Sequence, residues 1–290
     1  MAADDANPWS THRRRAEQLR GRYPFAAEVL GLYAGLVEAW HDTWLLACEE
    51  RPGPTELSDW SVRQALPRVV KVTEAAGPSA LAAAVRELPA DEVRDACTAW
   101  LAGAELDPVA AYVVRACLRP ALTALDDDGI AAAFFRDDTA VAADLDDPAA
   151  RVGLRCPRCG GPPQLSTRAG GDEKLVSGGR SLTCARCWHT WPFSASTCPS
   201  CGETAGAKRT LYAEHHDGPV VEAQPDPGAE PVHPHIRIEA CASCERFLLD
   251  IGLGRDPAAV PEVDELAAVP LALYAVDQGL TKITPNLVGF

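Results

Sequence analysis

The sequence predicts an α+β protein with an N-terminal all-α helical bundle, two small β modules of the zinc-ribbon or rubredoxin-like kind, and a C-terminal helix. Apolar residues recur every three or four positions through the first part of the chain, which is typical of helices with one buried face. After residue 155 short β-like segments and four Cys-x-x-Cys pairs replace this pattern. We therefore expect a helical domain with an acidic connector over 1–150, modules over 151–195 and 196–255, and a C-terminal helix and tail over 256–290.

The longest helix is expected between two proline signals. Pro24 suits a first helical turn because its missing N–H is not needed there, and the Pro-Gly-Pro run at 52–54 ends the helix. One face of this helix carries Val29, Leu32, Tyr33, Leu36, Val37, Trp40 and Trp44. This spacing indicates a long helix that packs against other helices.

Shorter helices with the same apolar spacing are expected to follow. Similar apolar patterns occur at 60–75, 80–88 and 91–101. Asp107 followed by Pro108 starts another helix, with an N-cap and a proline at the first helical position. Short polar connections between such helices favour a compact bundle.

The stretch 126–147 changes character. It holds eight aspartates and a single basic residue, Arg136. We interpret it as a solvated acidic connector with at most one short helix, and we place the domain boundary near residue 150.

The remainder predicts short strands and one closing helix. Strands are expected at 164–168, 182–184, 209–214 and 236–240, with a mobile proline- and glycine-rich loop over 218–234. Pro261 opens the last helix, Pro270 is expected to kink it, and Gly279 is placed to end it.

Eight of the eleven cysteines form closely spaced pairs. The pairs are Cys156 and Cys159, Cys184 and Cys187, Cys198 and Cys201, and Cys241 and Cys244. Two intervening residues let a tight turn bring both sulfurs to one ion, about 2.3 Å from a zinc. The chain shows no apolar run of transmembrane length and no secretory signal, so we expect a cytoplasmic protein, where such pairs hold metal more often than they form disulfides.

Two pairs make one tetrathiolate site, so we expect two metal ions, iron or zinc. Sequential pairing joins the first pair to the second and the third to the fourth, and each site then begins with a Cys-Pro-x-Cys-Gly turn. The alternative joins the two middle pairs across a short connection and leaves the outer pairs to meet. We favour the sequential arrangement.

The remaining cysteines and the histidines are expected to have ordinary roles. Cys48, Cys97 and Cys117 lie in helical patterns and are interpreted as small core residues. The histidines at 215, 216, 233 and 235 are interpreted as solvated loop residues, with a secondary metal site as the alternative. His189 is expected to pack between two tryptophans, with a role in shaping the surroundings of the first metal as its alternative.

The composition argues against several function classes. The formal charge of −14 disfavours general nucleic-acid binding, although 151–210 holds nine basic and three acidic residues. The chain has no phosphate loop, nucleophile elbow or His-Glu-x-x-His helix. Closed tetrathiolate sites leave no coordination position for substrate, so we expect no enzyme activity.

The cysteine motifs, in order, resemble the formate dehydrogenase accessory protein (FdhE) family. The residues that carry the resemblance are Cys-Pro-Arg-Cys-Gly from 156, Cys-Ala-Arg-Cys from 184 with Trp191, Cys-Pro-Ser-Cys-Gly from 198, Glu-Ala-Cys-Ala-Ser-Cys from 239, Asp-Glu-Leu-Ala from 264 and Pro-Asn-Leu from 285. The likeness covers roughly 150–290. Ala195, Leu249 and Thr284 stand where family members can carry arginine, lysine and asparagine.

The resemblance implies a maturation factor that binds the catalytic subunit of formate dehydrogenase through rubredoxin-like sites. On that reading the eight paired cysteines are the ligands of iron or zinc. Two other functions are weighed against it. A rubredoxin-like iron protein would pass electrons during assembly, and a zinc-ribbon protein would bind nucleic acid through the basic segment 151–210, with Trp188 and Trp191 stacking on bases.

Overall fold

The computed structural model describes residues 7–125, 127–134, 153–169, 179–214 and 231–290. Most of the acidic connector and of the expected loop over 218–234 lies outside these ranges, as do His215 and His216. Among the described helices, none combines the length and apolar character needed to cross a bilayer.

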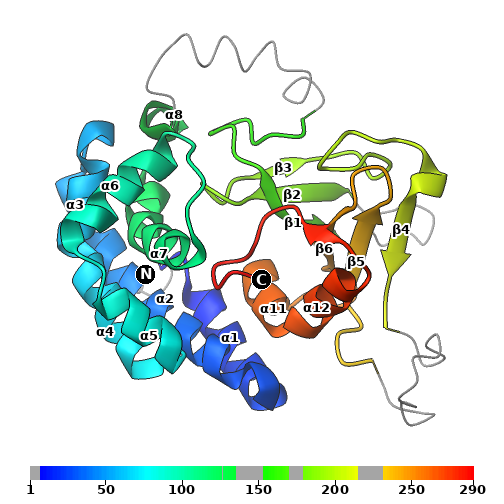
Figure 1. Ribbon diagram of the computed structural model, residues 1–290, viewed down its shortest axis with the longest axis horizontal. Coiled ribbons are helices and arrows are strands. Elements are labelled where there is room, and N and C mark those ends of the chain that lie inside the picture. The colour runs from blue at the N-terminus through cyan, green and yellow to red at the C-terminus, as the bar shows by residue number, and fades with distance from the viewer. Residues whose placement is uncertain (1–6, 126, 135–152, 170–178, 215–230) are drawn as a thin grey trace.

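The N-terminal half is a helical bundle, drawn from blue to green in Figure 1. Its helices are α1 (Ser10–Arg22), α2 (Ala27–Glu50), α3 (Leu57–Gln64), α4 (Leu66–Ala76), α5 (Ser79–Arg86), α6 (Ala90–Leu101), α7 (Pro108–Ala124) and α8 (Asp127–Phe134). The Asp107 carboxylate caps α7 by accepting from the N–H groups of Val109 and Ala110, as the sequence predicts. The expected helix over 60–75 is two helices, separated at Ala65.

Helix α1 is the main helix that the apolar pattern does not predict. Its sequence is polar, and its inward face presents Ala16, Leu19 and the guanidinium of Arg15. The buried Arg15 interrupts the apolar pattern, so this helix cannot be predicted until the partners of Arg15 are known.

The described residues of the C-terminal half include a seven-stranded sheet. Its strands are β1 (Pro163–Arg168), β2 (Arg180–Cys184), β3 (Thr190–Pro192), β4 (Arg209–Tyr212), β5 (Ile236–Cys241), β6 (Arg246–Gly252) and β7 (Thr281–Lys282). Strands β3-β2-β1-β6-β5-β4 lie in that order, and β7 pairs with β6. The fold class expected from the sequence is confirmed.

The two cysteine modules are joined within this sheet. Strand β1 of the first module pairs in parallel with β6 of the second, with Leu165 opposite Leu249 and Thr167 opposite Ile251. This pairing makes the two modules neighbours in one sheet. The expected boundary between them at residue 195 stays a prediction.

Strand β6 was not among the expected strands. Its run Phe247, Leu248 and Leu249 lacks the alternation that marks a half-exposed strand, because both of its faces are buried. It is a central strand, with β1 on one side and β5 on the other.

The closing helix is broken, as Pro270 predicts. Ala268 alone separates helix α11 (Pro261–Ala267) from helix α12 (Val269–Asp277). Helix α11 contacts α1, α2 and β1, and in Figure 1 it lies between the bundle and the sheet. Its buried residues Val263 and Leu266 belong to the same apolar cluster as the bundle helices and the first cysteine module.

The imidazole of His12 on α1 is expected to make the protein less stable in acid. Burial lowers the pKa of His12 to about 4, and its Nδ1 atom lies 2.8 Å from the Tyr33 hydroxyl. Its ordinary pKa is 6.5, so protons favour the unfolded chain; the stability from the neutral ring is complete above pH 6.5 and is lost as the pH falls toward 4. Urea unfolding of wild type and His12→Gln at about pH 7.5 and about pH 5 checks this. An equal loss of unfolding free energy between the two pH values in both proteins would contradict this prediction.

Candidate metal centres

Each Cys-x-x-Cys pair lies on a tight turn that needs one unusual backbone conformation. The residue after the second cysteine has a positive φ in all four turns: Gly160 at 66°, Trp188 at 58°, Gly202 at 78° and Glu245 at 55°. Glycine adopts this conformation at little cost, and two of the turns use it. The other two hold a bulky or charged residue there, which the glycine signal in the sequence could not reveal.

Backbone hydrogen bonds close these turns. The N–H groups of Gly160, Gly202 and Glu245 donate to the carbonyl oxygen of the first cysteine of their own pairs, at 2.9, 3.0 and 2.9 Å. The N–H groups of Arg186 and Ser200 point at the sulfurs of Cys184 and Cys198, at 3.3 and 3.4 Å. Such donors stabilise thiolates, so the turns are prepared for charged sulfur ligands.

The first and second pairs form one quartet. The Sγ atoms of Cys156 and Cys187 are 3.5 Å apart, and those of Cys159 and Cys184 are 3.4 Å apart. All four side chains are buried, and they join the apolar cluster of the helical bundle.

The third and fourth pairs form a second quartet that is more open. The Sγ atoms of Cys198 and Cys244 are 3.9 Å apart, and those of Cys201 and Cys241 are 3.8 Å apart. Cys201 is exposed and Cys244 is half-buried, whereas the other two are buried. The structure thus brings the pairs together in sequential order, as we expected.

Both quartets have the donor set and the spacing that a tetrahedral metal needs. In each, the four sulfurs lie within 4.8 Å of one another. A regular tetrahedron with zinc–sulfur bonds of about 2.3 Å has sulfur–sulfur edges of about 3.8 Å, close to the distances in the second quartet and slightly longer than those in the first. The two quartets could each hold one metal ion, and four thiolates suit zinc or iron.

Two features fix the first quartet against its surroundings. A Cβ atom added at Gly161 would lie 2.8 Å from the Cys184 sulfur, so only glycine fits there. On the other side, the indole of Trp188 lies 4.2 Å from the guanidinium carbon of Arg119, which pairs with Glu262 at 2.5 Å. Trp188, whose backbone has a positive φ, therefore contacts Arg119 of α7, which in turn pairs with Glu262 of α11.

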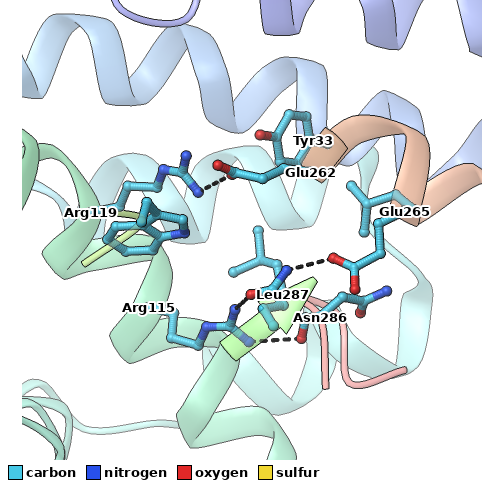
Figure 2. Close-up of a pocket in the computed structure, with 10 residues that line it drawn as sticks. Tyr33, Arg115, Arg119, Glu262, Glu265, Asn286 and Leu287 are labelled. Carbon is cyan, nitrogen blue, oxygen red and sulfur yellow. Dashed lines mark hydrogen bonds and ion pairs between the residues drawn. The ribbon is translucent and has the colours of Figure 1, made fainter. Parts of the chain in front are cut away.

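A polar junction lies beside that contact, where the bundle, β1, α11 and the C-terminal tail meet (Figure 2). The Arg115 guanidinium donates to the carbonyl of Asn286 at 2.8 Å and to Gln164 Oε1 at 2.6 Å. The Gln164 amide donates in turn to Glu265 Oε2 at 2.5 Å, and Lys282 pairs with the other oxygen of Glu265. These bonds hold the first cysteine module against the helices.

A cluster of buried and half-buried charges extends from the second quartet along β5 and β6. Glu239 is paired with Arg168, Arg180 and Arg209, and Asp250 is paired with Arg168 and Arg237. Four guanidinium groups thus face two carboxylates, which leaves a formal excess of two positive charges. A divalent ion with four thiolates carries a formal charge of −2, so this excess has the sign and size to balance it.

Two of these arginines contact the chain that leads into the second quartet. The Arg180 guanidinium donates to the carbonyls of Ser194 and Thr197, and Arg209 donates to that of Ala195. Arg209 also lies opposite Cys241 in the strand register. Burial lowers the pKa of Arg180 to about 10, which leaves it charged at neutral pH. The arginines were not singled out from the sequence; the basic excess over 151–210 was their only signal.

Removing one of these charges is expected to weaken metal binding at the second quartet alone. Arg180→Gln keeps a polar side chain but lacks the charge, and changes in the shell around metal ligands typically cost about 10–100-fold in affinity. Chelator competition with zinc measures both sites, so the first quartet in the same molecule is the control. Arg180→Lys should retain most of the affinity. An equal loss at both quartets would indicate general unfolding and contradict this role, and the more exposed Arg209→Gln repeats the test.

The remaining cysteines divide into two kinds. Cys97 and Cys117 are buried, as expected, and burial raises the pKa of Cys97 to about 12, so it stays a neutral thiol. The expectation for Cys48 is wrong, since its side chain is exposed near the end of α2.

The histidine expectations also need correction. His233 and His235 are buried, not solvated, because the chain before β5 folds against α1 and α11. His235 Nε2 lies 2.8 Å from the Asp264 carboxylate, and with Asp256 these groups could form a metal site. Arg15 already pairs with both carboxylates there. His189 is half-buried, and its carbonyl accepts a hydrogen bond from the Cys184 N–H.

Comparison with known proteins confirms the resemblance noted in the sequence. The chain is 27% identical over 135 residues to "Protein FdhE homolog" of Aquifex aeolicus and 32% identical over 135 residues to that of Pseudomonas aeruginosa. These matches cover 47% and 46% of this chain but 41% and 38% of the relatives' own lengths. No protein-family profile matches the chain.

A solved structure shares the fold over nearly the whole chain. The crystal structure of the FdhE protein from Pseudomonas aeruginosa superposes with a TM-score of 0.63 over 97% of this chain and 95% of its own. Sequence identity in that comparison is 20%, so this match establishes the fold. The helical bundle and the sheet region are therefore an arrangement that the two proteins have in common.

Proposed function

We propose that this chain is a cytoplasmic formate dehydrogenase accessory protein, a non-enzymatic maturation factor that binds the catalytic subunit of formate dehydrogenase. The observation that carries the proposal is the pair of cysteine quartets within a fold shared with an FdhE protein. The eight cysteines from Cys156 to Cys244 would be the ligands of two metal ions. The four-segment division of the chain then separates a helical part from the metal-holding part.

The quartets are suited to holding a metal and not to activating a substrate. Four thiolates fill a tetrahedral ion, and no position is left for water or a reacting group. The first quartet is enclosed by α7, α11 and the bundle core, which supports a structural role. Zinc would serve that role, and iron would add a redox couple.

One observation favours a second candidate function for the second quartet. Cys201 is exposed and Cys244 is half-buried, so a metal there would lie close to solvent and to any docked protein. Iron in that site could exchange electrons with a partner during assembly. Metal analysis and the visible spectrum of protein purified without a nickel-affinity step test this: colourless, zinc-only protein that still supports formate dehydrogenase activity would exclude it.

Capture of the purified catalytic subunit tests the main proposal. We expect the metal-loaded chain to retain the subunit on a column and to be required for formate dehydrogenase activity in a deletion strain. A variant with serine at both Cys156 and Cys184 should lose retention if metal-dependent folding supports the surface. Failure of both the metal-loaded and the metal-free chain to retain the subunit would contradict the proposal.

A further inference from the structure

A cleft of about 540 Å³ lies where three parts of the chain meet. One wall is the end of α6 and the connection to α7, the second is the first cysteine module, and the third is the C-terminal tail. Its apolar lining includes Trp100, Leu106, Pro108, Pro162, Pro285 and Leu287. The cleft is therefore built by segments that come together only in the folded chain.

The cleft is basic in a protein that is acidic overall. Arg115, Arg155 and Arg186 line it, against the single carboxylate of Glu105. Arg155 is exposed, and neither it nor Arg186 pairs with a carboxylate within the part of the chain that the structure describes. Local positive charge on a chain with a formal charge of −14 marks a place where a negative partner is attracted.

Arg115 is a third positive charge at the cleft wall. Its side chain is 7% exposed, and its Nε atom has no hydrogen-bond partner among the described residues. The guanidinium is also held in place by the carbonyls of Pro285 and Asn286, so it is a fixed charge at the cleft wall.

The lining favours a peptide over a nucleic acid. Single-stranded nucleic acid is held by exposed aromatic rings, whereas Trp100 is 7% exposed and packs against Phe134. Part of the basic charge of segment 151–210 is also neutralised inside the fold, since Arg168, Arg180 and Arg209 face Glu239. At the cleft, Arg155 and Arg186 lie beside prolines and leucines, which suits an extended chain with acidic side chains.

We infer that this cleft binds an extended, acidic segment of the client polypeptide. Arg155 and Arg186 would pair with its carboxylates, and the apolar residues of the cleft would contact its neighbouring side chains. The inference rests on the proposed function, because that function supplies the client. It places the contact next to the first quartet, so the metal that orders Cys184 would also order one wall of the cleft.

Charge reversal tests the inference with the purified catalytic subunit of formate dehydrogenase. We expect Arg155→Glu with Arg186→Glu to lower the affinity for the subunit at least tenfold, and wild-type binding to weaken as salt is raised. The matched control is Arg14→Glu with Arg63→Glu, which makes the same charge change on exposed arginines that do not line the cleft. Because Arg186 donates to the Gly103 carbonyl, Arg155→Glu alone is measured as well, and zinc content checks folding.

The outcomes separate the two proposals. If wild type binds the subunit and the cleft variants bind it equally well, the cleft inference is overturned and the proposed function stands. If wild type does not bind the subunit, both are overturned. Peptides that tile the subunit locate the segment, and we expect acidic ones to bind. Loss of binding to a labelled single-stranded RNA, with subunit binding unchanged, would assign the cleft to nucleic acid and overturn the inference.

Discussion

Cys184→Ala is expected to release the metal of the first quartet and to unfold the protein at ordinary temperature. The Cys184 side chain is fully buried, and its quartet belongs to the apolar cluster that includes the bundle helices and α11. Structural zinc contributes about 10–16 kcal/mol of folding free energy in zinc-finger peptides, as much as the whole stability of many domains. Circular dichroism on heating should show no cooperative transition near that of wild type.

Cys201→Ala is the matched control for this prediction. It removes the same chemical group from the second quartet, where the side chain is exposed at the edge of the fold. We expect the bound metal to fall from two equivalents to one while the helical bundle stays folded. If Cys184→Ala keeps two equivalents of metal, or if both variants melt alike, the structural role of the first quartet is wrong.

Asp264→Ala is expected to destabilise the protein by about 3 kcal/mol, the lower end of the cost of breaking a buried ion pair, because Arg15 would keep Asp256 as its second partner. The Asp264 carboxylate is 1% exposed and accepts from Arg15 Nε at 3.0 Å and Nη2 at 2.5 Å. It also lies against His235 and accepts from the N–H of Val260. The variant would leave Arg15 buried between α1 and α11, so the docking of the N-terminal helix on the C-terminal half should weaken. Urea unfolding measures the change.

A salt bridge from the same helix serves as the control. Arg13 pairs with Glu38 at 3.1 Å, but the two side chains are 53% and 65% exposed. Glu38→Ala should change the free energy of unfolding by about 1 kcal/mol or less, because water already solvates both charges. Equal effects of Asp264→Ala and Glu38→Ala would show that burial does not decide the strength of these pairs.

Much of the helical half could be predicted because one-sided burial leaves a period in the sequence. Helix α2 and the start of α7 follow from apolar spacing and an N-cap. Helix α1 could not be predicted this way, since Arg15 is its buried anchor and its partners lie near the other end of the chain. Strand β6 was missed for a different reason: it is buried on both faces, and its apolar run over 247–249 shows no alternation.

The sequence predicts those parts of the candidate site that depend on residues close together in the chain. The four cysteine pairs follow from turns that are four residues long, whereas their sequential order of pairing was favoured over an alternative and is seen only in the structure. The buried arginines could not be predicted in this way, because Arg180 on β2 meets Glu239 on β5 only through the pairing of β1 with β6. The burial of His235 was missed because it follows Pro234 and precedes β5, which made it look like part of a loop.

The parallel pairing of β1 with β6 has a consequence for the order of events on the ribosome. The first quartet and the β1–β2 hairpin are complete in the nascent chain well before β6 is synthesised. Until then the edge of β1 that β6 will cover has unpaired N–H and C=O groups, and such edges recruit other strands. Early metal capture would fix the β1–β2 hairpin but leave that edge open. We therefore expect chains arrested before residue 246 to be prone to self-association, even when their first quartet is loaded.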